Sequence, residues 1–592
     1  MKRELRPAST ARRASVLLVV LVVIVLLALA AYSLMQMCVA ENEASNRFAR
    51  EAQARAFAES GIDMAVTLLS DPAERLQPDF VTNRPDALSA VVIKESDVPH
   101  GRGRFSVVAP DPSDATSKNV QFGLLDESGK LNLNALAAWQ ANSALKLTDA
   151  TARNFLLNLP YMTNDLADSI LDFLDTDDTA RQYGAESDYY TTLSPPYRAA
   201  NGPIQSLDDL LLVRGVTPAL LYGEDLNRNG ILDPGEDING DGIFDRGWSA
   251  YLTVSSAERN VQQDGTSRMN VNQQDLPSLY DQLAGTLGQK QAQYIVAYRI
   301  NGPASTGSNS SGGGRGGSSG GSSGGSSSGG GGGGGSSGSM SGGGSSGGGS
   351  SGGGSSGGGS SGGGSSGGGS SGGGSTGGRR VGNAATKTSG PTVQRDGLQV
   401  PMPPSTGSYT ITSIYQLIGG SVRAQVNGRS TTLTSPFLSS QTQVASYLPD
   451  MLDKLSLSDD LFIKGRINVN TAPIQVLLGL PNMTEQLATQ IIAAQAAGSS
   501  SQSSSAQNPR ASTAWLVAEG LVSASTMASL DPYLTARGDV YRVQSVGFFD
   551  EGGPVVRLEA VIDAAVEPAR ILTLRDLTEL GRGFTPQQLG VH

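Results

Sequence analysis

An uninterrupted apolar segment near the N-terminus constrains the fold of this chain more than any other feature. Residues 15–37 carry no charged side chain, and about 20 apolar residues are enough for a helix to cross the hydrocarbon core of a bilayer. Neither Gly nor Pro interrupts the sequence from there to Gly61, and the intervening residues are mostly good helix formers. The sequence therefore predicts one long helix, of which residues 15–37 span a membrane.

Basic residues precede the apolar segment and predict its orientation. The five basic residues are Lys2, Arg3, Arg6, Arg12 and Arg13, and the only acidic residue among them is Glu4. The positive-inside rule keeps this end in the cytoplasm, so the chain after Met37 is exported. A cleaved secretory signal is the alternative, but its apolar region has roughly 7 to 15 residues and ends at a cleavage site. Here the helical pattern continues instead.

Residues 38–70 predict an amphipathic stem that continues the membrane helix. Apolar residues recur at roughly helical spacing, with charged residues between them: Phe48, Ala52, Ala56, Ile62 or Met64, Ala65 and Leu69. Such a stem packs one face on other structure. A plain anchor with a helical spacer is the alternative.

The start of the chain resembles a type IV pilin-like protein with a prepilin peptidase site. The resemblance rests on the basic leader ending at Ala14, on the apolar helix that begins at Ser15 and on the stem that ends near Gly61. It implies a leader of residues 1–14, cut between Ala14 and Ser15 by a prepilin peptidase. Gly usually precedes the cut and Glu is usually the fifth mature residue, where this chain has Ala14 and Val19. Among the pseudopilins of type II secretion, the minor member K lacks that Glu.

The acidic composition limits the partners of the exported part. The net charge is −11 and the sequence pI is about 4.9, which argues against a nucleic-acid partner. Cys38 is the only cysteine. An intramolecular disulfide is therefore impossible, and an exported chain of this kind depends on core packing or metal for stability.

Residues 303–378 are almost entirely Gly and Ser, with GGGSS repeats. Such a composition has no side chains with which to build a core, so the tract is expected to be a disordered insertion. The alternative is a neutral insertion without a role.

A motif of a basic residue, an apolar residue, Asn, an apolar residue and Asn occurs three times. The copies begin at Lys130, Arg268 and Arg466. Apolar helical segments follow each copy, and after a loop a further short helix is expected from Ile204, Ile411 and Thr513 respectively. The pattern predicts a helical domain over residues 129–537 built of three helix-turn-helix units, with the Gly/Ser tract in the long loop of the second.

These units also resemble helix-hairpin-helix modules that bind DNA phosphates through turn amides. Their turns, at residues 159–165 and 480–486, lack the GxG of such modules. The alternative function is nevertheless a minor pilin of a type IV pilus or DNA-uptake system, which uses these units to bind DNA or surfaces.

Alternating apolar residues predict an antiparallel sheet in residues 71–128 and 538–566. Residues 550–554 (DEGGP) separate two strand-like segments, which is typical of a hairpin. The stem and this sheet form a pilin-like α+β domain, and the helical units are inserted between its strands.

The whole pattern is similar to the K pseudopilin family. The resemblance rests on residues 123–136 (GLLDESGKLNLNAL), 170–190 (ILDFLDTDDTARQYGAESDYY) and 466–473 (RINVNTAP), and on the final hairpin. It implies a minor pseudopilin at the tip of the periplasmic pseudopilus of type II secretion, anchored by one pass in the inner membrane. Other minor pseudopilins, and exported substrates, are the partners that it implies.

Residues 225–248 predict a calcium site. Asp225, Asn227, Asn229, Asp233 and Glu236 occupy positions 1, 3, 5, 9 and 12 of the calcium-loop template, with Gly230 at position 6 and the carbonyl of Ile231 at position 7. Pro234 prevents an ordinary exiting helix. An Asp/Asn/Gly turn without metal is the alternative.

A second loop begins directly after the first. Its candidate ligands are Asp237, Asn239, Asp241, the carbonyl of Ile243, and Asp245. Trp248 stands at the twelfth position, where a carboxylate is needed. The second site is therefore incomplete, or it shares ligands with the first.

Two further patterns contain ionisable side chains. Asp168, Asp172 and Asp175 lie on one face of a predicted helix, which favours a solvated acidic face, with a second metal site or a docking patch as the alternative. The two histidines, His100 and His592, form no nucleophile–base set. The sequence therefore predicts a protein that is not an enzyme.

Overall fold

The structure, a computed structural model, describes residues 11–71, 83–112, 114, 116–304, 391–403, 407, 409–500 and 510–591. The predicted leader up to residue 10 and the Gly/Ser tract from residue 305 lie outside the described residues. Their roles stay predictions.

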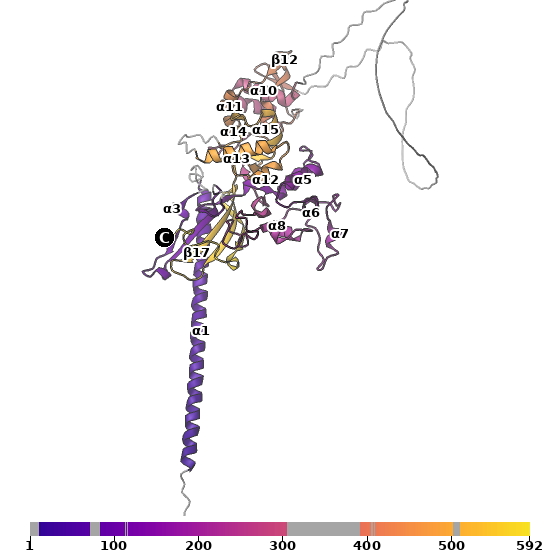
Figure 1. Ribbon diagram of the computed structural model, residues 1–592. Helices are drawn as coiled ribbons and strands as arrows, with labels where there is room; N and C mark the ends of the chain where they lie inside the picture. The colour runs from indigo at the N-terminus through magenta and orange to yellow at the C-terminus, as the bar shows by residue number, and fades with distance from the viewer. Residues whose placement is uncertain are drawn as a thin grey trace, which may run out of the picture. The chain divides into compact units, whose positions relative to one another are not determined.

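The first element is one α-helix, α1 (Ala11–Ser70), as the absence of breakers predicted. Its 60 residues extend over about 90 Å at ~1.5 Å per residue. Within the described part of the chain, α1 is the one helix long and apolar enough to cross a membrane. Side chains 16–49 are exposed, whereas one face from Ala54 onward is buried. The helix thus has a free half and a packed half (Figure 1).

The packed half of α1 lies on an antiparallel sheet in the order β1-β2-β17-β18-β19. The strands are β1 (Val91–Lys94), β2 (Gly103–Pro110), β17 (Val540–Phe549), β18 (Val556–Asp563) and β19 (Arg570–Asp576), with the short β3 (Val120–Gln121) beside β2 and β4 (Leu125–Asp126) beside β17. The β17–β18 hairpin was predicted. The predicted sheet boundary at residue 566 was too early, because β19 also pairs along β18.

Gly547 in β17 lets the stem approach the sheet closely. A Cβ atom at this position would lie 2.0 Å from the carbonyl oxygen of Ala54 and 2.5 Å from the amide nitrogen of Ala58, both in α1. Only a residue without a side chain fits such a contact between backbones. The stem therefore depends on this glycine to reach its packed position.

The sheet has an apolar core on each face. On the stem side, α1 residues such as Phe57 and Ile62 pack with Phe105 and Leu558. The opposite face carries a smaller core made by Val108, Ile231, Val546, Phe548, Phe584 and Leu589. The second core joins the sheet to the inserted region and to the C-terminal segment.

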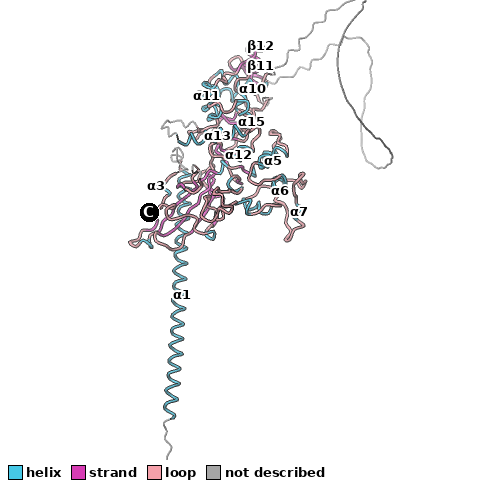
Figure 2. The backbone as a smooth tube through the Cα atoms, in the orientation of Figure 1, coloured by secondary structure: helices cyan, strands magenta, loops and turns pink. Residues whose placement is uncertain are grey.

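The region inserted between β4 and β17 is mostly helical and has its own large core. Its helices are α4 (Leu133–Ala141), α5 (Asp149–Leu157), α6 (Asn164–Leu174), α7 (Ser187–Tyr190), α8 (Pro218–Tyr222), α9 (Leu276–Thr286), α10 (Gln289–Asn301), α11 (Gln441–Lys454), α12 (Ile474–Leu478), α13 (Glu485–Ser500), α14 (Ala514–Ala518) and α15 (Ala524–Leu530). The α+β fold class predicted from the sequence is confirmed (Figure 2).

Two details of the inserted region differ from the prediction. The helices expected from Ile204 and Ile411 are short 3₁₀ turns, Leu207–Leu212 and Ile414–Leu417. A four-stranded antiparallel sheet was not predicted; its strands are β9 (Thr392–Arg395), β10 (Leu398–Pro401), β11 (Ser421–Val426) and β12 (Arg429–Thr434).

The three Asn-rich motifs occupy equivalent structural positions. Each forms a short strand that pairs in parallel with a later one: β5 (Leu131–Asn132) with β6 (Leu252–Thr253), β8 (Met269–Asn270) with β13 (Leu455–Ser456), and β15 (Ile467–Asn468) with β16 (Leu534–Thr535). Another antiparallel pair, β7 (Ala257–Arg259) with β14 (Phe462–Lys464), links the first and third copies.

The second Asn of each motif ties two chain segments together. The side-chain amides of Asn134, Asn272 and Asn470 each donate to two backbone carbonyl groups at 2.8–3.1 Å. One carbonyl belongs to a loop and the other follows the paired strand: Ile204 and Val254, Ile411 and Leu457, and Arg510 and Ala536. Each copy of the motif therefore holds a loop against the segment that follows the paired strand.

Candidate functional site

The first acidic loop, residues 225–236, wraps its backbone around Asp225. The two carboxylate oxygens of Asp225 accept hydrogen bonds from the amides of Asn229 at 2.9 Å and Gly230 at 3.0 Å. Gly230 has a φ of +79°, a conformation that favours glycine. This turn directs the following residues back toward Asp225.

The predicted side-chain ligands of the first loop converge. The amide groups of Asn227 and Asn229 both donate to Asp233 Oδ2, at 2.6 and 2.8 Å. Glu236 closes the loop. Its Oε1 accepts a hydrogen bond from the backbone amide of Asn227 at 3.2 Å, and its Oε2 accepts one from the backbone amide of Asp233 at 3.0 Å. Five oxygen-bearing side chains, including Asp225, are thus brought to one place.

The second loop, residues 237–245, folds in the same way. Asp237 accepts hydrogen bonds from the amides of Gly240 at 2.6 Å and Gly242 at 2.9 Å. The amide group of Asn239 donates to Asp245 Oδ2 at 3.2 Å. Trp248, at the position of the missing carboxylate, is fully buried and directs its Nε1 to the carbonyl of Pro160, so it faces away from the loop.

Glu224 takes the place that Trp248 leaves. Its Oε1 accepts from the amide of Ile238 at 2.9 Å and its Oε2 from the amide of Asp245 at 3.0 Å. The calcium-loop template does not predict this residue, because it is read forward from the first Asp. The signal was present in a tandem repeat of twelve residues, in which Glu224-Asp225 corresponds to Glu236-Asp237.

The donor set fits a hard divalent cation. Glu224 and Glu236 are 5% and 6% exposed, and burial raises the pKa of Asp225 to about 7, with the charge of Glu236 adding to the increase. Carboxylate, amide and carbonyl oxygens in loops of this kind are the ligands that calcium prefers. A bound cation would supply positive charge where the chain concentrates buried carboxylates.

The first loop also contacts the pilin-like sheet. Ile231 packs in the core on the sheet face opposite the stem. The side chain of Gln544 in β17 donates to the carbonyl of Arg228 at 2.7 Å, and the buried Arg557 in β18 donates to the carbonyl of Asn227. The amide of Asn229 reaches the carbonyl of Gly583 in the C-terminal segment. The loop therefore joins three parts of the protein.

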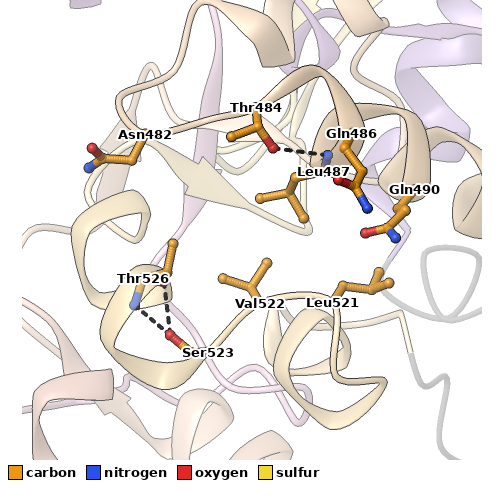
Figure 3. A pocket seen from close by; sticks show the side chains of 9 residues that line it. All are labelled: Asn482, Thr484, Gln486, Leu487, Gln490, Leu521, Val522, Ser523 and Thr526. Carbon is orange, nitrogen blue, oxygen red and sulfur yellow. Dashed lines mark hydrogen bonds between the residues drawn. The ribbon is translucent and has the colours of Figure 1, made fainter.

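A groove of about 280 Å³ lies between the start of α13 and the start of α15. Figure 3 shows the apolar side chains of Leu487, Leu521 and Val522 between polar ones. None of the lining residues is ionisable: Asn482, Thr484, Gln486, Leu487, Gln490, Leu521, Val522, Ser523 and Thr526. The groove lies at one of the turns that resembled DNA-binding hairpins, yet it offers no Lys or Arg to a phosphate.

The acidic helix face is not solvated, contrary to the favoured interpretation of the sequence. Asp168 and Asp172 in α6 are fully buried. Asp168 forms two hydrogen bonds with Arg153 at 2.6 and 2.7 Å. The arginine partners come from other segments, which is why the helical pattern alone did not reveal the burial. Of the two histidines, His100 is exposed near Glu551 at 3.6 Å, and His592 lies outside the described residues.

The fold and the stem define a pilin-like α+β protein with one apolar helix and a large inserted region. Within that region, residues 129–222 match the family model described as "Type II secretion system (T2SS), protein K". A curated relative, "Putative type II secretion system protein K" of Escherichia coli (strain K12), is 33% identical over 104 residues, which are 17% of this chain and 32% of the relative. The predicted resemblance to K-type minor pseudopilins is confirmed by these matches.

The chain spans about a third of the length of that curated relative. A crystal structure, the GspK–GspI–GspJ complex of the type II secretion system from enterotoxigenic Escherichia coli, aligns with 90% of this chain and 99% of its own chain. The sequence identity is 11% and the TM-score 0.33.

Proposed function

We propose that the chain is a minor pseudopilin of a type II secretion system, a structural subunit that serves protein export across the outer membrane. One observation carries the proposal. Residues 129–222, which match the protein K family model, are inserted between strands of a sheet, and the second half of the apolar helix packs on that sheet. The exposed half of α1 supplies the single-pass anchor in the inner membrane, and the remainder of the chain stands in the periplasm.

The stem is the surface through which we propose assembly with other minor pseudopilins. Side chains 16–49 are exposed, and Phe48 is 75% exposed. An apolar helix that leaves the membrane needs a new apolar environment, which neighbouring stems provide. Transfer of such side chains out of water gains about 25 cal/mol per Å² of apolar surface.

A place at the tip is proposed from Val19. If the Glu usually found at this position pairs with the N-terminus of a neighbouring subunit, its absence fits a subunit with none above it. Processing by prepilin peptidase between Ala14 and Ser15 precedes assembly in this proposal. Replacing Val19 by Glu tests the tip position: the variant is expected to lose its tip placement, and normal tip assembly would contradict the idea.

Calcium is the proposed cofactor of the two acidic loops. Asp225, Asn227, Asn229, Asp233, Glu236 and the carbonyl of Ile231 serve the first ion. Asp237, Asn239, Asp241, Asp245 and the carbonyl of Ile243 serve the second, with Glu224 in the closing position. Loop one contributes only three carboxylates, so the expected dissociation constant is of the extracellular type, on the order of 10⁻⁴ to 10⁻³ M. In this proposal the cation stabilises the junction between the inserted region and the sheet.

Crosslinking in secreting cells tests the assembly proposal. Cys38 is first replaced by Ser, and Phe48→Cys is introduced on the exposed stem surface. Disulfide adducts with cysteine-bearing minor pseudopilins are expected from this variant. The matched control, Thr432→Cys on exposed β12, is expected to give none. Equal adducts from both positions, or none from the stem while secretion proceeds, would contradict assembly through the stem.

A further inference from the structure

A cavity of about 360 Å³ lies between the start of α10 and the end of β12. Helix α10 packs against β10 and β11 of the four-stranded sheet, and β12 is an end strand of that sheet. Lys290 and Tyr294 line the cavity from the helix, and Thr434 lines it from the strand. Pockets that hold small organic ligands have volumes of about 300–1,000 Å³, so the cavity is large enough for a small one.

The hydroxyl group of Tyr294 is the feature of this cavity that points to a ligand. Tyr294 is 1% exposed, and its Oη is buried and has no hydrogen-bond partner in the described part of the chain. The large majority of buried polar atoms have such a partner. The hydroxyl of Ser435, which also lines the cavity, is already engaged, because its Oγ donates to the carbonyl of Leu417 at 2.5 Å and accepts from the amide of Phe437 at 3.1 Å.

The Tyr294 hydroxyl keeps its proton at neutral pH and is therefore a hydrogen-bond donor. Burial raises the pKa of Tyr294, and the nearby Ser435 hydroxyl opposes only part of this increase. Gly420 lies beside the hydroxyl, since a Cβ atom there would be 3.1 Å from Oη, and a glycine has no side chain to offer as an acceptor. The hydroxyl can thus donate to a group that the described part of the chain does not provide.

The start of α10 carries positive charge beside this donor. The N-cap is Gly288, which has no side chain to accept from the first amides, and the first turn contains no acidic residue. Lys290 stands in this turn, where the positive end of the helix dipole disfavours a cation. Helix starts with free amides bind anions. An anion in the cavity would offset the charges of Lys290 and of the helix end together.

The other lining groups favour a carboxylate on a carbon skeleton over a bare inorganic ion. Among the described residues that line the cavity, Lys290 alone is charged, so it balances one negative charge. Leu433 and Pro436 add apolar surface, and Thr434 adds a hydroxyl group. Organic ligands are held in this way, by apolar walls and a few polar groups that fix their orientation.

We propose that the cavity between α10 and β12 binds the carboxylate group of a small organic acid or of a peptide end. Lys290 supplies the counter-charge, Tyr294 donates a hydrogen bond from the buried side, and Thr434 offers its hydroxyl from the strand. The site shares no residue with the acidic loops or with the stem, so it stands or falls independently of the proposed calcium binding and assembly.

Saturation-transfer NMR of the full chain in a neutral detergent tests the proposal. The probes are propionate, N-acetyl-dialanine and the C-terminal amide of that dipeptide, which lacks the negative charge. Both acids are expected to give a saturable signal, and the amide none. Tyr294→Phe and Lys290→Gln should each weaken binding of the acids about tenfold, because each removes a contact to a charged group. The matched controls Tyr197→Phe and Lys464→Gln lie outside the cavity and should bind as the unchanged protein does.

The outcomes distinguish the two sources of the carboxylate. Tighter binding of the dipeptide than of propionate assigns the site to a peptide end, and equal or weaker binding assigns it to small acids. Either result supports the site. The proposal is overturned if neither acid binds, if the amide binds as well as the acid, or if Lys290→Gln leaves binding unchanged.

Tyr294→Phe also has a readout without ligand. Because the hydroxyl has no partner among the described residues, its removal is expected to leave the thermal unfolding temperature unchanged or to raise it. A lower unfolding temperature would show that the hydroxyl already has a partner within the protein, and it would overturn the role of Tyr294 in the site.

Discussion

Glu224 Oε2 accepts a hydrogen bond from the amide of Asp245 at 3.0 Å, and Glu236 Oε2 accepts the equivalent bond from Asp233 at the same distance. Each glutamate closes a loop of nine to twelve residues by binding its first and last segments. Glu224 stands before the first loop yet closes the second. Glu224 therefore links the start of the first loop to both ends of the second.

Glu224→Gln is expected to weaken calcium binding to the second loop at least tenfold, because it removes the one carboxylate in the closing position. Glu236→Gln should weaken the first loop in the same way. Isothermal titration calorimetry of the full chain measures both. Glu579→Gln, an exposed residue near the C-terminus, is the control. If Glu224→Gln binds as the unchanged protein does, the second loop is not completed by this residue.

Removal of calcium is expected to loosen the C-terminal segment as well as the loops. Ile231 shares a core with Phe584 and Leu589, and Asn229 reaches Gly583. Hydrogen exchange followed by mass spectrometry should show faster exchange in residues 577–591 after addition of a chelator. The strands of the three Asn motifs are the internal reference. Faster exchange throughout the chain would instead indicate general unfolding.

Arg542→Met is expected to destabilise the sheet by about 3–5 kcal/mol at neutral pH, because it leaves the buried carboxylate of Glu127 without its main partner. Arg542 Nε donates to Glu127 at 2.9 Å and Nη1 to Glu559 at 2.7 Å. Arg570→Met breaks a pair whose arginine is 61% exposed and should cost no more than about 1 kcal/mol. Exchange of the β18 amides gives both free energies.

The stabilisation of the sheet by Arg542 depends on pH through the charge of Glu127. Burial alone would raise the pKa of Glu127, but the charges of Arg542 and Lys130 outweigh it and hold the pKa below its ordinary value. A carboxylate with a lowered folded pKa stabilises the fold above its unfolded pKa of about 4.3, and this stability is lost as the pH falls toward the folded value. The difference between Arg542→Met and the unchanged protein should therefore shrink in acid. A constant difference would contradict the role of the Glu127 charge.

Gly547→Ala is expected to displace the stem from the sheet, because the new Cβ atom would lie 2.0 Å from the carbonyl oxygen of Ala54. Limited proteolysis should then cut within residues 54–70. In the unchanged protein one face of this part of α1 is buried against the sheet. Gly285→Ala is the matched control, since nothing lies within 4 Å of a Cβ atom there. In helix α9 this change should be neutral or stabilising by about 0.5–1 kcal/mol. Equal resistance of both variants would show that the sheet accommodates the methyl group.

The stem and the β17–β18 hairpin could be predicted from the sequence because their signals are local. A helix without Gly or Pro up to residue 60 is visible in the sequence itself, and α1 ends at Ser70, the predicted end of the stem. The four-stranded sheet had a local signal that was overlooked: Asp396-Gly397 and Asn427-Gly428 join its strands, and all four residues have positive φ, as type I′ turns require.

Other features had no local signal. The burial of Asp168 and Asp172 depends on Arg153 and Arg181, which α6 does not contain. The 3₁₀ turn at Leu207–Leu212 follows a capping box between Ser206 and Asp209, which predicts a helix start but not how soon it ends. The role of Glu224 can be recognised in the sequence only when the two loops are compared with each other.

The pairing of β2 with β17 has a consequence for the order in which the protein is made. Helix α1 and β2 precede the inserted region in the chain, whereas β17 and β18, which complete the sheet against the buried face of the helix, follow it. Until β17 and β18 are made, Phe57 and Ile62 can pack only on earlier residues such as Phe105 in β2, while the inserted region can already complete its own core. Contacts between such distant parts of a chain form slowly. A subunit that stops short of β17 would therefore present an anchored helix with an open apolar face, a natural target for quality-control proteases.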